Sequence, residues 1–133
     1  MMEQARAVWA PRVLSLLRIM AGLLFIEHGL AKYFQFPHVA AFDNLQFTSL
    51  PGIGGIVELV CGALITVGLF TPIAALLASG EMAVAYFTAH APRGFFPLLN
   101  GGSLAVLYCW VFFYLVFAGG GPWSLDAVMR KKA

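Results

Sequence analysis

Four long apolar stretches constrain the fold of this chain more than any other feature. They run from about Val13 to Phe34, Gly52 to Phe70, Pro72 to Ala91 and Leu98 to Ala118. Each has roughly 20 residues, the length that a helix needs to cross a bilayer. Charged residues make up only 11% of the chain, whereas about a quarter is usual in a soluble domain. We therefore predict an integral membrane protein.

The stretches are expected to be helices. A helix satisfies its own backbone polar groups in lipid, and runs such as Leu104–Leu107 lack the alternation of barrel strands. With 133 residues, we predict one all-α domain over residues 1–133, a four-helix transmembrane bundle. The long connection from Gln35 to Pro51 is expected to form either a short amphipathic segment in the interface or an irregular apolar loop.

The basic residues predict the orientation. Most of them lie in the two tails, namely Arg6, Arg12, Arg130, Lys131 and Lys132. The opposite connections offer only Lys32, near a helix end, and Arg93. An even number of spans puts both termini on one side, and the positive-inside rule makes that side cytoplasmic. Polar residues interrupt the first span, so we expect it to be retained rather than cleaved as a signal peptide.

A few polar side chains fall inside or at the ends of the spans. They are Arg18, Glu27, His28, Lys32, Glu58, Glu81, His90 and Asn100. A charged group near mid-bilayer costs about 3 kcal/mol even on lenient scales. We therefore expect these side chains to face the bundle interior and to pair with one another. The rise of about 1.5 Å per helical residue places most of them in the outer half of the bundle.

Two interpretations of this polar set stay open. In the first, the set holds the helices in register through buried ion pairs, with Arg18 and Glu27 as candidates and Arg18 reaching toward Glu81. In the second, it forms a pocket for a headgroup, a quinone ring or a proton path. The candidates for that pocket are His28, Lys32, Glu58, Glu81, His90 and Asn100.

Other chemistry finds little support in the sequence. No zinc spacing, Walker loop or dinucleotide fingerprint is present, so no metal site is predicted. His28 and His90 could in principle ligate haem, but they differ in depth by roughly 6 Å, and haem is not expected. Cys61 and Cys109 are expected to pack as small apolar residues. A net charge of +2 without a basic stripe argues against nucleic acid.

Several short motifs resemble those of the DoxX family. They are His28-Gly29-x-x-Lys32, Gly55-x-x-Glu58-x-x-Cys61-Gly62, Gly68-Leu69-Phe70-Thr71, Phe87-Thr88-Ala89-His90, Gly94-Phe95-Phe96-Pro97, Asn100-Gly101-Gly102 and Gly121-Pro122-x-Ser124-Leu125-Asp126. Their order and spacing follow the family over about residues 14–128. One position departs from it, because Ser103 stands where many relatives have Glu.

The resemblance implies a four-helix protein of the bacterial plasma membrane. The family name comes from relatives linked to a thiosulfate:quinone oxidoreductase, and other relatives are tied to membrane thiol and oxidative-stress complexes. It thus implies a quinone- or thiol-linked oxidoreductase, or a membrane subunit of one, working with a redox partner or as a homo-oligomer. Two alternatives remain: a non-catalytic accessory subunit of a membrane complex, and a carrier of a small molecule linked to protons.

Overall fold

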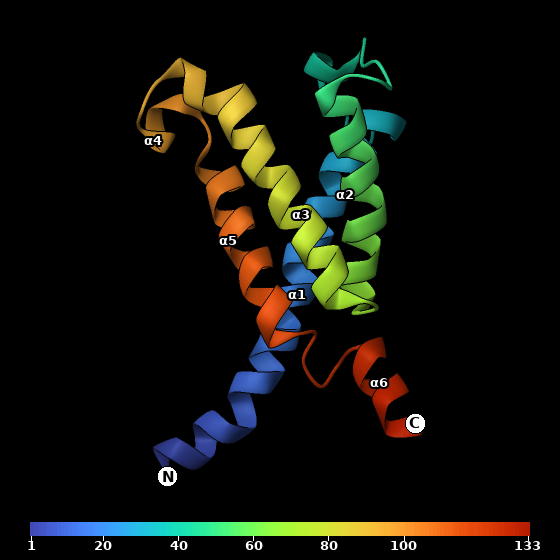
Figure 1. Ribbon diagram of the computed structural model, residues 1–133, viewed down its shortest axis with the longest axis vertical. Coiled ribbons are helices and arrows are strands. Elements are labelled where there is room, and N and C mark those ends of the chain that lie inside the picture. The colour runs from blue at the N-terminus through green and yellow to red at the C-terminus, as the bar shows by residue number, and fades with distance from the viewer.

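The computed structural model describes residues 1–133 and contains helices and no strand (Figure 1). The long helices are α1 (Met2–Phe34), α2 (Leu50–Val67), α3 (Thr71–Ala85) and α5 (Ser103–Ala118). The short ones are η1 (Ala40–Phe42), η2 (Tyr86–His90), η3 (Ala91–Arg93), α4 (Pro97–Asn100) and α6 (Leu125–Lys132). By length and composition α1, α2 and the helical stretch Thr71–Arg93 can cross a membrane, and α5 is a shorter apolar helix of 16 residues. Three to four apolar helices therefore suit a membrane bundle.

The helix ends differ from the predicted spans in three places. α3 ends as an α-helix at Ala85 rather than near Ala91, and the chain continues as the π-helix η2. α1 begins at Met2 rather than near Val13, so its first part projects beyond the other helices (Figure 1). The last apolar helix begins at Ser103 rather than near Leu98. A break at Gly101, whose φ of +76° is the left-handed conformation that favours glycine, separates it from α4.

The connection between α1 and α2 is largely irregular. Its only helical element is the single 3-10 turn η1, and an amphipathic α-helix does not form there. The sequence left both forms open, and the irregular apolar loop is the one observed. Phe42 in η1 folds toward the bundle, where its ring centroid lies 5.5 Å from Lys32 Nζ.

The long helices are arranged as two pairs. α1 packs mainly on α2, α3 packs mainly on α5, and α2 joins the pairs by packing on α3. Figure 1 shows the pairs meeting at one end and diverging toward the other. We call the diverging end, which carries residues 35–49 and 86–102, the open end. The end that carries the α2–α3 turn and α6 is the closed end.

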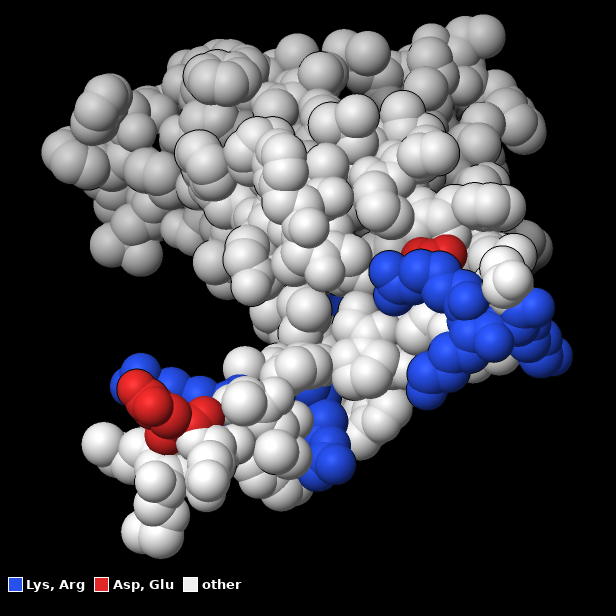
Figure 2. Space-filling view, turned by 60° about the horizontal axis from the view of Figure 1, so that its bottom comes forward, with Lys and Arg blue, Asp and Glu red and all other residues white.

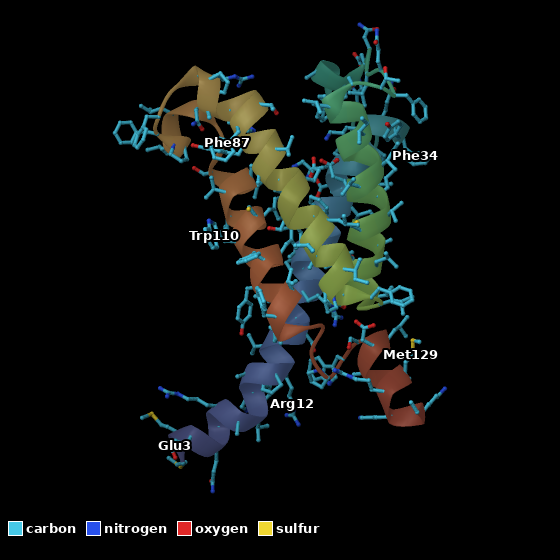
Figure 3. The ribbon with its side chains drawn as sticks, viewed as in Figure 1. Glu3, Arg12, Phe34, Phe87, Trp110 and Met129 are labelled. Atoms are coloured by element: carbon cyan, nitrogen blue, oxygen red, sulfur yellow. The ribbon has the colours of Figure 1, made fainter.

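Small residues allow the helices to approach closely. A Cβ atom on Gly62 of α2 would lie 3.0 Å from the Cβ of Ile26 on α1. Such contacts are the usual basis of helix association in lipid, where the hydrophobic effect gives little drive. Larger side chains fill the remaining interior, including Phe25, Ile65, Phe112 and Leu115. The outer faces carry exposed apolar side chains, as Trp110 shows (Figure 3).

Arg18 holds the closed end together. Its side chain is 1% exposed, and its two terminal nitrogens donate hydrogen bonds to the carbonyl oxygens of Gly120, Trp123 (2.8 Å) and Thr66 (3.4 Å). Ser15 Oγ, one turn earlier on α1, accepts from the Trp123 N–H at 3.1 Å. These bonds tie the segment between α5 and α6 to α1 and α2.

Asp126 adds a second tie at this end. Its carboxylate accepts the N–H groups of Phe70 (2.8 Å) and Thr71 (3.0 Å) at the start of α3. Burial acts to raise the pKa of Asp126, but the hydrogen bonds from Thr71 and Phe70 and the charge of Arg130 outweigh it, so the pKa lies below its ordinary value. Ser124 caps α6 by accepting from the Ala127 N–H at 3.1 Å.

Candidate functional site

A cavity of about 600 Å³ lies between the two helix pairs toward the open end. Its walls are mainly apolar and come from α1, α2, α3 and α5, with Phe25, Ile53, Val57, Met82 and Leu104 among them. Its polar lining consists of His28, Lys32, Glu58, Glu81, Thr88, His90 and Tyr108. Pockets of this volume with few polar groups are typical of sites for small organic ligands.

Lys32 of α1 and Glu58 of α2 form an ion pair in this cavity. Lys32 Nζ donates to Glu58 Oε1 at 2.8 Å, and the side chains are 10% and 2% exposed. The resemblance to the family placed both residues in motifs, and the structure brings the two motifs together. A buried pair of this kind is weak evidence for stability, because the desolvation of both charges offsets their attraction.

Glu81 of α3 supplies a second carboxyl to the same cavity. Its Oε1 lies against α2 at Gly54, where an added Cβ atom would be only 2.5 Å from it. Gly54 thus makes room for the carboxyl.

Two carboxyl oxygens in the cavity wall have no hydrogen-bond donor within the chain. They are Glu58 Oε2 and Glu81 Oε2, and both are fully buried. A buried acceptor without a donor costs about 1–3 kcal/mol. Lys32 is the one Lys or Arg that lines the cavity, so two carboxyls share one cation. The site is therefore suited to hold protons or to receive hydrogen bonds from a ligand.

The two histidines of the cavity resemble each other in their hydrogen bonding. His28 Nδ1 lies 2.9 Å from the Leu24 carbonyl oxygen, and His90 Nδ1 lies 3.1 Å from that of Asn100. A carbonyl oxygen only accepts, so the proton of each neutral ring lies on Nδ1. The Nε2 atom of each ring then remains available as an acceptor.

Tyr108 of α5 is a site residue that sequence reasoning missed. It was one member of an aromatic run that covers most of its helix, and nothing in the sequence distinguished it. In the structure it is buried, stacks on Phe112 with centroids 5.5 Å apart, and meets His28 edge to face at 5.9 Å. Its ring forms part of the cavity wall.

Three of the polar residues singled out in the sequence lie elsewhere. Asn100 is buried beside the cavity, and its amide joins Gly94, Gly102 and Tyr86 by hydrogen bonds, which fixes the turn before α5. Arg18 binds carbonyl oxygens at the closed end instead of pairing with Glu81, and its Nε has no partner. Glu27 is exposed on α1 and takes part in no ion pair.

The cysteines contribute no polar lining to the cavity. Cys61 is buried, Cys109 is partly buried, and both are free thiols. Ser79 donates to the carbonyl oxygen of Cys109 at 2.8 Å, which ties α3 to α5. No cluster of three His, Cys, Asp or Glu side chains is placed to hold a metal ion.

Comparison with known proteins agrees with these features. The DoxX family model matches residues 13–91. An uncharacterized protein of Haemophilus influenzae is 41% identical over 128 residues, covering 93% of this chain and 96% of that protein. An uncharacterized membrane protein of Mycobacterium tuberculosis is 28% identical over 133 residues, covering 88% of this chain and 81% of that protein. No solved structure matches. The chain therefore belongs to the DoxX family of membrane proteins.

Proposed function

We propose that this chain is the quinone-binding membrane component of a thiol-linked oxidoreductase in the bacterial plasma membrane. One observation carries the proposal. An apolar cavity of about 600 Å³ contains the Lys32–Glu58 pair and the carboxyl of Glu81. A lipid-soluble ligand with a polar ring suits such a site, because its body needs apolar contact and its oxygens need polar partners.

The residues match the two ends of a quinone ring. Lys32 uses one of its three N–H donors on Glu58, which leaves two for a carbonyl oxygen of the ring. The Tyr108 hydroxyl makes no hydrogen bond within the cavity wall and offers another donor. The tail of the ligand would follow the apolar walls toward the lipid.

Reduction of a bound quinone by thiols balances in atoms and electrons. Two thiols lose two electrons and two protons and join in a disulfide, while the quinone gains both and becomes a quinol. Glu58 and Glu81 are the groups that would pass protons to the ring, since each has a carboxyl oxygen without a donor in the chain. Lys32 would hold Glu58 in position and balance its charge.

The thiols are proposed to come from a substrate or a partner subunit. Cys61 and Cys109 do not line the cavity, so the chain itself does not supply them. With both termini cytoplasmic, the open end faces outward, and a thiol would approach from there. The hydrogen bonds of Arg18 at the other end support access from one side, which favours a binding site over a transport path.

The test uses the full chain purified from bacterial membranes in mild detergent. Mass spectrometry of the extract is expected to find quinone at about one molecule per chain, and a dithiol is expected to reduce a short-chain quinone analogue in its presence. Glu58→Gln should lower both by about tenfold or more. Glu27→Gln is the matched control, because it removes a carboxylate from the same bundle outside the cavity.

Three results would contradict the proposal. The first is the absence of both bound quinone and quinone reduction, with or without co-purified subunits. The second is an equal effect of Glu27→Gln and Glu58→Gln. The third is a Glu58→Gln protein that changes only in thermal stability, which would leave the ion pair with a structural role.

A further inference from the structure

A groove at the closed end remains unexplained by the proposed function. It has a volume of about 540 Å³ and lies between α6 and the start of α3. Phe70, Ile73 and Met129 form apolar parts of its lining, and Arg130 lies beside them. Figure 3 shows Met129 on α6, next to the α2–α3 turn.

The two charged residues of this groove, Asp126 and Arg130, differ in their hydrogen bonding within the chain. Asp126, the one acidic residue of its lining, already accepts two backbone N–H groups of α3. The charge of Arg130 lowers the pKa of Asp126, but the two side chains form no ion pair within 4 Å, unlike Lys32 with Glu58. Its guanidinium is therefore available to an anion from outside the chain.

More positive charge lies close to the groove. Lys131 and Lys132 follow Arg130 in the last turn of α6 and are exposed. Figure 2, which looks toward the closed end, shows Lys and Arg side chains at opposite sides of this face, with acidic atoms beside them. The apolar side chains of α6, Leu125, Val128 and Met129, are also exposed. Basic and apolar side chains together on one helix are typical of a helix in the membrane interface.

We propose that this groove binds an anionic phospholipid. Arg130 would hold the headgroup phosphate through two N–H groups, as a planar guanidinium does well. Phe70 and Ile73, which are 55% and 65% exposed, would contact the first part of an acyl chain. Lys131 and Lys132 would attract the negative headgroup, and Trp123 on the same end is placed as an interfacial aromatic residue.

An anionic lipid fits this groove better than an acidic protein segment. The groove has an apolar wall beside the guanidinium of Arg130, at one end of a membrane bundle. A phospholipid at that depth has its headgroup next to the first part of its acyl chain, so one molecule can contact both. An acidic peptide would offer carboxylates but would leave Phe70 and Ile73 exposed. The lipid would also hold α6 against the bundle, and α6 carries the Asp126 cap of α3.

The test is native mass spectrometry of the purified chain titrated with dioleoylphosphatidylglycerol or with the zwitterionic dioleoylphosphatidylcholine. Phosphatidylglycerol is expected to bind preferentially. Arg130→Gln should weaken its binding about fivefold, the usual contribution of one basic residue at an anionic surface. Arg130→Lys should recover part of it. Arg93→Gln, at the open end, is expected to leave binding unchanged.

A second basic variant separates a site from general attraction. Arg6→Gln removes a charge from the projecting part of α1, away from the groove. An Arg6→Gln effect equal to that of Arg130→Gln would overturn the proposal, and so would equal binding of the two lipids. Binding of an acidic peptide in preference to phosphatidylglycerol would overturn it as well. Circular dichroism of each variant checks that the helices remain folded.

Discussion

The two ends of the bundle treat buried charge in opposite ways. At the closed end, Arg18 donates to the carbonyl oxygens of α2 and of the segment between α5 and α6, and Asp126 accepts the free N–H groups of α3. At the open end, Glu58 and Glu81 each keep a buried oxygen that no donor in the chain reaches. Groups whose partners are in the chain stabilise the fold, whereas unpartnered groups in a cavity are candidates for ligand binding.

Replacement of Arg18 should have the largest effect. Arg18→Met removes the charged donor of the Gly120 and Trp123 carbonyl oxygens and leaves Ser15 as the remaining tie between α1 and the segment before α6. We expect a loss of about 3 kcal/mol in the free energy of unfolding, measured by denaturant titration in detergent. A loss below about 0.5 kcal/mol would show that Arg18 does not hold this end.

The Lys32–Glu58 pair should respond differently to single and double changes. Lys32→Met leaves Glu58 unpaired in the bundle, and we expect it to destabilise by about 3 kcal/mol. Lys32→Met with Glu58→Leu removes both charges, and its stability should return to within about 1 kcal/mol of the wild type. Quinone binding should still be lost. A double variant as unstable as the single one would give the pair a structural role like that of Arg18.

Asp126 makes the stability of the closed end depend on pH. Its pKa is lower in the folded chain than its ordinary value of 3.8, so its contribution is complete above that value and is lost as the pH falls through the folded pKa. Asp126→Asn should cost about 1 kcal/mol at neutral pH, as caps usually do. The melting temperatures of the wild type and of Asp126→Asn should converge as the pH falls. A constant difference between the two at all pH values would contradict the assignment of this pH dependence to Asp126.

Gly54→Ala should have the smallest effect on stability. A Cβ atom there would lie 2.5 Å from Glu81 Oε1, so the carboxyl must move away. Ala favours a helix by about 1 kcal/mol over Gly. This gain should offset the cost of moving the carboxyl, so the free energy of unfolding should change little. The Michaelis constant for quinone should rise several-fold. An unchanged constant would mean that the position of the Glu81 carboxyl does not matter for binding.

Much of the architecture followed from the sequence, because lipid imposes simple rules. Apolar length predicted the helices. The cost of intramembrane charge predicted that polar side chains turn inward, which is wrong for Glu27, since it is exposed on α1. His28, Lys32, Glu58 and Glu81 do line one cavity. The start of α5 at Ser103 was not predicted. The apolar length of a segment does not show where a glycine interrupts its helix.

The partners of Arg18 and Asp126 could not be predicted from sequence. Both side chains bind backbone groups, and every residue has a backbone, so no residue type marks the contact. Tyr108 was hidden for a related reason, because an aromatic run covers most faces of its helix and only packing selects one of them. Helix α6 was missed because its basic residues were interpreted only as a signal of orientation.

One measurement tests directly whether the open end is the ligand site. Quinone content per chain is determined by mass spectrometry for the wild type and for the double variant Lys32→Met, Glu58→Leu, with folding checked by circular dichroism. We expect about one quinone per chain in the wild type and almost none in a double variant that remains folded. Equal quinone content in the two proteins would contradict the assignment of the cavity.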